Sequence, residues 1–291
     1  MKTRPQLFVL ALFFALFACG KPTSEGDVDI LVTHEVNGQA LVTDSRCYVN
    51  EAGNHYLVNE VQWFLSNLQI QDEKAEWHEL GTAFYIDTDI PESQLLESIP
   101  LPVGNYVKIH FVFGFNADDN QTGRFTNPPE SEMFWPDELG GGYHYMKLNG
   151  KYLNADSLLA PPAIHLGTGQ NAELTSFYDN SFVVELPLDF AVTEGRNNRL
   201  NLVMNIENWF RNPNTYDFSV YGSAIMQNQE AQALLQQNGH DVFSIKNAQD
   251  MKSPLKTTVQ LFKKAAPKPH FMTWENIKSI LSDFNNTKDP S

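Results

Sequence analysis

The sequence predicts an all-β protein, an antiparallel immunoglobulin-like or Greek-key β-sandwich with a small helical appendage at its C-terminal end. Three observations support this fold class. Apolar and β-branched residues alternate with polar residues in many short runs. Turn signals such as Asn37-Gly38, Asn149-Gly150 and Glu194-Gly195 punctuate the runs. Hardly any helical pattern lies between them, which is typical of a sandwich or barrel.

The predicted strands, in chain order, cover residues 28–32, 61–70, 107–113, 143–148, 163–166, 182–188 and 199–206. Residues 116–142 break the pattern with a long connection rich in Asn, Asp, Pro and Gly, and connections of this length are often functional. Helical patterns appear only later, at residues 227–237 and 273–284, with a linker predicted at 263–269. The helical appendage is therefore expected at the C-terminal end.

The first eighteen residues have the organisation of an export signal. Lys2 and Arg4 precede an apolar run over residues 7–17, which is shorter than the roughly 20 residues that a spanning helix needs. The run ends at Ala18-Cys19-Gly20, which resembles the bacterial lipobox. That resemblance implies cleavage after residue 18 and a lipid on Cys19, the alternative being an ordinary signal peptide with a chance cysteine. We therefore expect a lipid-anchored protein of a bacterial cell envelope, in the outer membrane, on its periplasmic or its surface face.

The mature chain would have 291 − 18 = 273 residues. We divide it into a tether at 19–27, a β-sandwich domain at 28–226 and a helical C-terminal extension at 227–291. Removal of Lys2 and Arg4 changes the formal net charge from −15 to −17, which argues against nucleic acid as a partner. With Cys19 acylated, Cys47 alone remains, so no intrachain disulfide can form.

No catalytic motif is present in the sequence. It lacks the Gly-x-Ser-x-Gly elbow, His-Glu-x-x-His and Gly-x-Gly-x-x-Gly patterns, and nothing selects one acid–base pair among its many carboxylates. Residues 116–123 are similar to the front half of a calcium loop, but Pro129 stands where the bidentate Glu belongs, which favours a plain Asx-turn loop. We therefore expect a protein that is not an enzyme.

The histidines and the aromatic residues leave two kinds of site open. Alternation places His144 and Met146 on one face of a strand, and an imidazole beside a thioether suits copper. His165 alternates with apolar neighbours, and His34 ends the first strand, although a single histidine is more often structural. The tryptophans either bind a sugar from an exposed surface or simply fill the core, and the second interpretation is preferred.

Several ordered segments resemble one known family. They include residues 61–70 around Trp63, then Met133-Phe134-Trp135, Gly142-Tyr143 and His165-Leu166-Gly167, within residues 28–210. In this order they resemble the MbnP family, periplasmic copper-binding proteins associated with methanobactin. The resemblance implies an all-β domain that binds copper through histidine. In some members a dihaem redox partner protein oxidises a tryptophan to kynurenine, which also contributes to the copper site.

The resemblance transfers to individual residues. His165 matches the histidine of the His-Leu-Gly motif, and Trp135 matches the tryptophan of Met-Phe-Trp. His34 lies in the first strand, where many relatives place a histidine, whereas His144 is proposed from its local sequence alone. The chain departs from the family at Pro136-Asp137, where relatives often have a second Trp, and at residues 169–171, where some members have cysteines. The extension beyond 226 is also outside the family pattern.

The leading expectation is an extracytoplasmic protein that binds or sequesters copper without catalysis. Its expected ligands are His165, His34 and His144, with Met133, Met146 and Trp135 close by. Because protons compete for histidine nitrogens, copper affinity is expected to fall below roughly pH 6 to 6.5. The alternative is a metal-free surface lipoprotein that binds carbohydrate or protein through exposed aromatic residues of the 116–142 connection.

Overall fold

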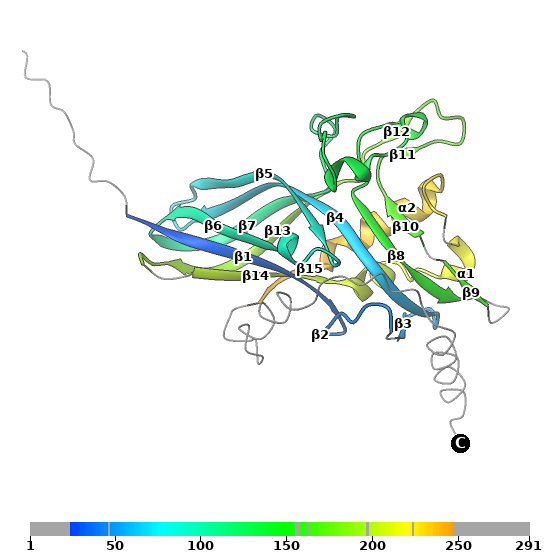
Figure 1. Ribbon diagram of the computed structural model, residues 1–291, viewed down its shortest axis with the longest axis horizontal. Coiled ribbons are helices and arrows are strands. Elements are labelled where there is room, and N and C mark those ends of the chain that lie inside the picture. Colours follow the sequence, from blue (N-terminus) through cyan, green and yellow to red (C-terminus); the bar gives the residue numbers. More distant parts are fainter. Residues whose placement is uncertain are drawn as a thin grey trace, which may run out of the picture.

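Two packed β-sheets form the body of the protein in a computed structural model, which describes residues 24–246 except 46, 155–157, 162, 196–197 and 223 (Figure 1). The first sheet contains β1 (Glu25–Val36), β2 (Gln39–Ala40), β6 (Leu95–Pro102), β14 (Asn198–Asn205) and β15 (Phe243–Lys246). The second contains β3 (Tyr48–Val49), β4 (His55–Asp72), β5 (Trp77–Asp87), β7 (Gly104–Phe113), β8 (Met146–Leu153), β9 (Leu159–Ala160), β10 (Ala163–Leu166) and β13 (Phe182–Val192).

The remaining elements are short. Strands β11 (Gly169–Gln170) and β12 (Phe177–Tyr178) form a separate two-stranded ribbon. The α-helices are α1 (Phe218–Tyr221) and α2 (Gln229–Asn238). The 3-10 helices are η1 (Pro91–Gln94), η2 (Glu130–Met133), η3 (Asp137–Leu139), η4 (Ile206–Phe210) and η5 (Gly239–Asp241). The prediction of a β-sandwich with a small helical appendage is confirmed.

The core lies between the two sheets and is rich in aromatic rings. Trp63 of β4 stacks on Phe113 of β7, with ring centroids 6.1 Å apart, and Phe243 of β15 packs 5.4 Å from Trp63 across the interface. Trp63 and Trp209 are fully buried. The preferred interpretation of the tryptophans, that they fill the core, is confirmed for these two.

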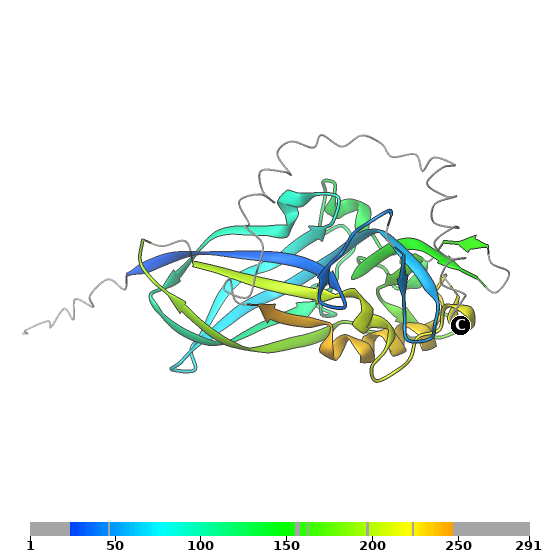
Figure 2. The same cartoon turned by 90° about the horizontal axis from the view of Figure 1, so that it is seen from below.

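Strand β1 departs from the antiparallel pattern. It pairs with β14 in parallel, with Val28 opposite Asn198, and the two strands run side by side in both views (Figures 1 and 2). The other strand pairs of the two main sheets that the structure describes are antiparallel. The parallel pair inserts β1 between β14 and β6, so the N-terminal strand lies inside the first sheet.

Two predicted boundaries and one predicted turn were wrong. Strand β1 begins at Glu25, inside the predicted tether at 19–27, because its first residues pair with β6. Strand β15, inside the predicted helical extension, pairs with β14 and completes the first sheet. Asn149-Gly150, predicted as a turn, lies within β8, and a Cβ at Gly150 would overlap the carbonyl oxygen of Leu57 on the neighbouring strand.

One of the two predicted helices is confirmed, and the other predictions at the two ends of the chain concern residues that the structure does not describe. The helix predicted at 227–237 is present as α2, and the side chain of Asn228 caps it by accepting from the N–H of Ala231. The signal peptide, Cys19, the linker at 263–269 and the helix at 273–284 lie outside the described residues. No helix in the described part of the chain is both apolar and long enough to cross a bilayer.

Candidate metal site

A tight hairpin brings the Met-Phe-Trp segment against the Gly-Tyr segment. The N–H of Trp135 donates to Gly142 O at 2.8 Å, and the N–H of His144 donates to Met133 O at 2.7 Å. Helix η3 and Gly140 to Gly142 close the hairpin, and these three glycines have φ angles of 108°, 67° and 82°, which side chains disfavour. The three glycines therefore let the chain reverse direction, which places His144 beside Met133 and Trp135.

The long connection at 116–142 holds this hairpin in place. Thr122 Oγ1 accepts from the N–H of Gly142 at 2.8 Å, and Asn120 Oδ1 accepts from the N–H of Tyr143 at 2.9 Å. Earlier in the connection, Asn116 Oδ1 accepts from the N–H of Asp119 at 2.9 Å, a local bond that spans three residues rather than the two of the expected Asx-turn. The connection thus acts as a support for the segment that carries His144.

His144, His165 and Trp135 converge on the outer face of the second sheet. His165 of β10 lies opposite Lys147 of β8, and His144 lies two residues before the first residue of that strand, Met146. The rings of His144 and His165 meet edge to face with centroids 5.0 Å apart, and the ring of Trp135 lies 4.7 Å from that of His144. The structure therefore brings together three of the residues predicted from the sequence.

Hydrogen bonds indicate which nitrogen of each imidazole carries the proton and which one keeps a lone pair. His144 Nδ1 lies 3.1 Å from Met133 O, so it carries the proton and leaves Nε2 as an acceptor. That Nε2 is buried and has no hydrogen-bond partner among the described residues. His165 Nε2 lies 3.1 Å from Asn149 Oδ1, which accepts its proton and leaves Nδ1 with the lone pair. Asn149 Nδ2 in turn donates to Glu60 Oε2 at 3.3 Å.

The surroundings keep both imidazoles neutral. Burial, then His165 and Lys147, lowers the pKa of His144 to about 3. Burial and the charge of Lys147 lower the pKa of His165 to about 4. Neither ring has a carboxylate within 4.0 Å in the described part of the chain. At neutral pH the pair therefore offers two uncharged nitrogen donors.

Met146 and His34 lie on the other side of the sheet. Met146 pairs with Trp63 and with Leu166, so its side chain shares the core face, whereas the neighbouring His165 has the opposite orientation. The predicted placement of His144 and Met146 on one face is wrong, because the chain bends at Tyr145 before β8 begins. His34 is buried in the core, where its Nε2 accepts from Trp63 Nε1 at 3.0 Å. The structure does not bring His34 to His144 and His165.

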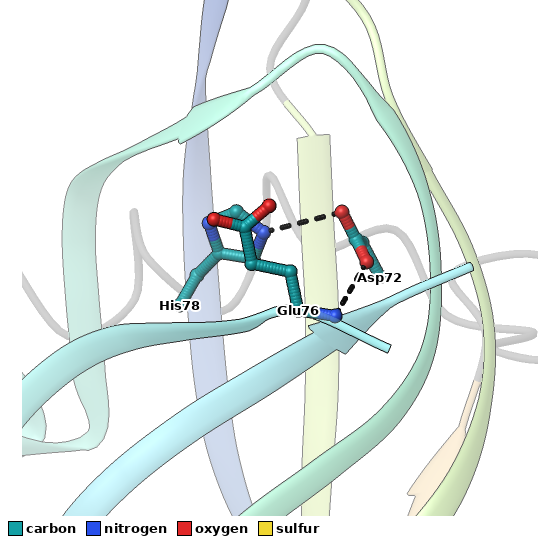
Figure 3. Close-up of side chains that lie close together, drawn as sticks. All are labelled: Asp72, Glu76 and His78. Carbon is teal, nitrogen blue, oxygen red and sulfur yellow. Dashed lines mark hydrogen bonds and ion pairs between the residues drawn. The ribbon is translucent and has the colours of Figure 1, made fainter. Parts of the chain in front are cut away.

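A separate cluster lies at the turn between β4 and β5 (Figure 3). In the described residues it is the one group of three or more His, Cys, Asp or Glu whose candidate ligand atoms lie within 4.8 Å of one another, and it comprises Asp72, Glu76 and His78. Asp72 Oδ1 accepts from the N–H groups of Lys74 and Glu76, at 2.9 Å each, and Oδ2 lies 3.5 Å from His78 Nε2. These contacts stabilise the turn. Ten residues of β4, roughly 30 Å, separate Asp72 from Gln62, which lies opposite Lys147.

Elsewhere in the described residues, an open, uncharged cavity has a volume of about 600 Å³. Five amide side chains and one aromatic ring line it: Gln170, Asn171, Gln227, Asn228, Gln229 and Tyr178. Trp135, in contrast, is 1% exposed and donates from Nε1 to Leu139 O at 3.0 Å, so it offers no open stacking surface.

Sequence reasoning missed two residues that hold the site, Lys147 and Asn149. Both could have been found by pairing the predicted strand at 163–166 with residues 146–149, because this register places Lys147 and Asn149 beside His165. The prediction of a turn at Asn149-Gly150 ended the strand too early for this pairing to be recognised.

The fold and the paired imidazoles define an all-β protein with a neutral histidine pair on one sheet face, in which His144 is buried and His165 is half-buried. The MbnP family model matches residues 25–229, and the chain belongs to this family. Among solved structures, it is similar to MbnP from Methylosinus trichosporium, with a TM-score of 0.52, 11% identity, and coverage of 77% of this chain and 99% of that one. This likeness shows the fold alone. No curated protein sequence matches the chain.

Proposed function

We propose that this chain binds copper through His144 Nε2 and His165 Nδ1, outside the cytoplasm and without catalysis. The observation that carries the proposal is the orphaned Nε2 of His144, a buried acceptor with no partner in the described residues. Leaving such an atom unpaired costs about 1–3 kcal/mol, so a ligand that uses its lone pair would remove a real penalty. Copper fits, because imidazole nitrogens are good copper donors.

The contacts behind the ligands support the same assignment. Histidines that bind metals usually donate their other ring N–H to a carbonyl or carboxylate, which fixes the ring and the tautomer. Met133 O serves His144 in this way, and Asn149 Oδ1 serves His165. Trp135 packs against the buried His144 ring with the two planes nearly perpendicular. The copper association of the MbnP family, to which the chain belongs, points to the same metal.

The location is the second part of the proposal. The export signal at residues 1–18 and the lipobox cysteine Cys19 support a lipid anchor in the outer membrane of a bacterial envelope. A dihaem redox partner, which the family resemblance implies for some members, would act on Trp135. Mass spectrometry of the purified chain tests both, through a lipid mass on Cys19 and an oxidised residue at Trp135.

The copper test compares metal content of the full chain after loading with Cu(I) and desalting. We expect one copper per chain in wild type, and loss of it in His144→Ala and in His165→Ala. His240→Ala is the matched control, because His240 is exposed and bonds only to a helix carbonyl in the described part of the chain. Copper retained in both site variants, or absent from wild type, would contradict the proposal.

The amide-lined cavity supports the alternative function, a metal-free protein that binds carbohydrate. Amide groups hydrogen-bond sugar hydroxyls, and Tyr178, 45% exposed, offers a ring for stacking. A glycan panel with wild type and Tyr178→Ala tests it. Binding that Tyr178→Ala removes, in a chain that takes up no copper, would favour the alternative.

A further inference from the structure

Lys147 is a charged residue placed beside the histidine pair. It lies directly opposite His165 in the register of β8 and β10, so both side chains leave the same face of the sheet, about 5 Å apart at their Cβ atoms. Its Nζ donates to Glu132 O at 2.8 Å. Glu132 precedes Met133, whose carbonyl holds His144. The ammonium group is thus fixed next to both imidazoles.

The charges that face Lys147 do not reach the histidines directly. Gln62, opposite Lys147 on β4, is neutral, and the carboxylates of Glu60 and Glu132 act on Lys147 itself. Glu60 is bonded to Asn149 rather than to a histidine. In the described residues, neither His144 nor His165 has a carboxylate within 4.0 Å. The proposed donors are therefore neutral, and the charge beside them is positive.

We propose that Lys147 makes the site selective for monovalent copper, Cu(I), over divalent copper, Cu(II). This inference rests on the copper site proposed above. A fixed positive charge repels a divalent ion twice as strongly as a monovalent ion at the same position. The two proposed donors are neutral, and the carboxylates of Glu60 and Glu132 act on Lys147 without lying within 4.0 Å of either imidazole in the described residues. Two nitrogens also suit Cu(I) better than Cu(II), which prefers a square-planar or tetragonal set.

The test measures Cu(I) and Cu(II) affinities of the full chain with competing chelators. Lys147→Met removes the charge and keeps most of the side-chain length, and Lys147→Gln is a second neutral variant in case the first does not fold. Lys147→Arg keeps the charge. Lys151→Met is the matched control, because Lys151 lies on the same strand and face but opposite Leu57, away from His165.

The neutral variants are expected to raise the ratio of Cu(II) to Cu(I) affinity about tenfold, which for one electron is a midpoint potential lower by about 59 mV. Lys147→Arg and Lys151→Met should stay within about twofold of wild type. Copper binding with an unchanged ratio in both neutral variants would overturn the role of Lys147 and leave the copper site intact. A wild type that binds no copper would overturn the copper site itself, and this inference with it.

Discussion

Gly167 leaves the space that the indole of Trp135 occupies. A Cβ at position 167 would overlap the six-membered ring of Trp135, so the glycine of the His-Leu-Gly segment and the tryptophan of the Met-Phe-Trp segment fit each other. Trp135 then packs on His144, and His144 on His165. Two motifs that are about thirty residues apart in the sequence thus form one packed unit around the histidine pair.

Gly167→Ala should therefore displace Trp135 and destabilise the protein. Overpacking of this kind costs about 1–3 kcal/mol in the free energy of unfolding. Urea unfolding followed by tryptophan fluorescence measures it. The matched control is Gly104→Ala, where an added Cβ meets no atom within 4 Å. Equal unfolding free energies in the two variants would mean that Trp135 does not depend on the missing side chain.

His144→Phe should separate copper binding from stability. Phenylalanine keeps a ring against Trp135 but removes the buried Nε2 that lacks a partner, along with the Nδ1 bond to Met133 O. The lost bond contributes about 1 kcal/mol and the removed orphan saves a similar amount, so the free energy of unfolding should change by less than about 1 kcal/mol. Copper uptake should disappear. A variant that unfolds readily would show that His144 is a structural histidine.

The lowered pKa values of the two histidines predict another pH dependence of copper affinity than the sequence alone does. Copper affinity was expected to fall below roughly pH 6 to 6.5, as for free histidines. Burial and Lys147 hold the pKa of His144 at about 3 and that of His165 at about 4, so protons compete with copper only near pH 4. Chelator competition should give similar Cu(I) affinities at pH 7 and pH 5. A steep loss between these values would mean that the histidines titrate as exposed groups.

The same shifts set the pH dependence of stability. The folded pKa values, including about 4 for buried His34, lie below the unfolded value of 6.5, so the unfolded chain takes up protons first. Stability is therefore complete above pH 6.5 and is lost as the pH falls towards 4, by about 1.4 kcal/mol per pH unit for each such histidine. Urea unfolding of the copper-free chain at pH 7 and pH 5 measures the loss. An unfolding free energy that rises on acidification would contradict the burial of neutral histidines.

Asn149→Leu should weaken copper binding without removing a ligand. Asn149 Oδ1 accepts the Nε2 proton of His165, and without it the ring can present either nitrogen. Loss of such a partner typically lowers metal affinity about 10–100-fold. Asn149→Asp keeps the acceptor and should retain the affinity to within about tenfold. If Asn149→Leu binds copper as tightly as wild type, this hydrogen bond does not orient His165.

Alternation and turn residues predicted most strands, because side-chain period depends only on local sequence. They could not predict that β1 pairs with β14, since Val28 and Asn198 meet only after the chain has passed through both sheets. The period also fails at Tyr145, whose N–H donates to Leu166 O and whose carbonyl accepts from Phe64, so that the bend turns His144 towards His165. His165 and Trp135 were predictable from motifs. The sequence could not show that His34 lies apart from His144 and His165, because its hydrogen bond to Trp63 joins strands of two different sheets.

The most direct measurement is the ¹⁵N NMR spectrum of the histidine side chains before and after Cu(I) is added to the full chain. It distinguishes the two nitrogens of every ring. We expect the signals of His144 Nε2 and His165 Nδ1 to shift on binding, while those of the ring nitrogens of His34 and His78 do not. Shifts confined to His34 or His78, or no shift at any histidine, would contradict copper binding by the His144–His165 pair.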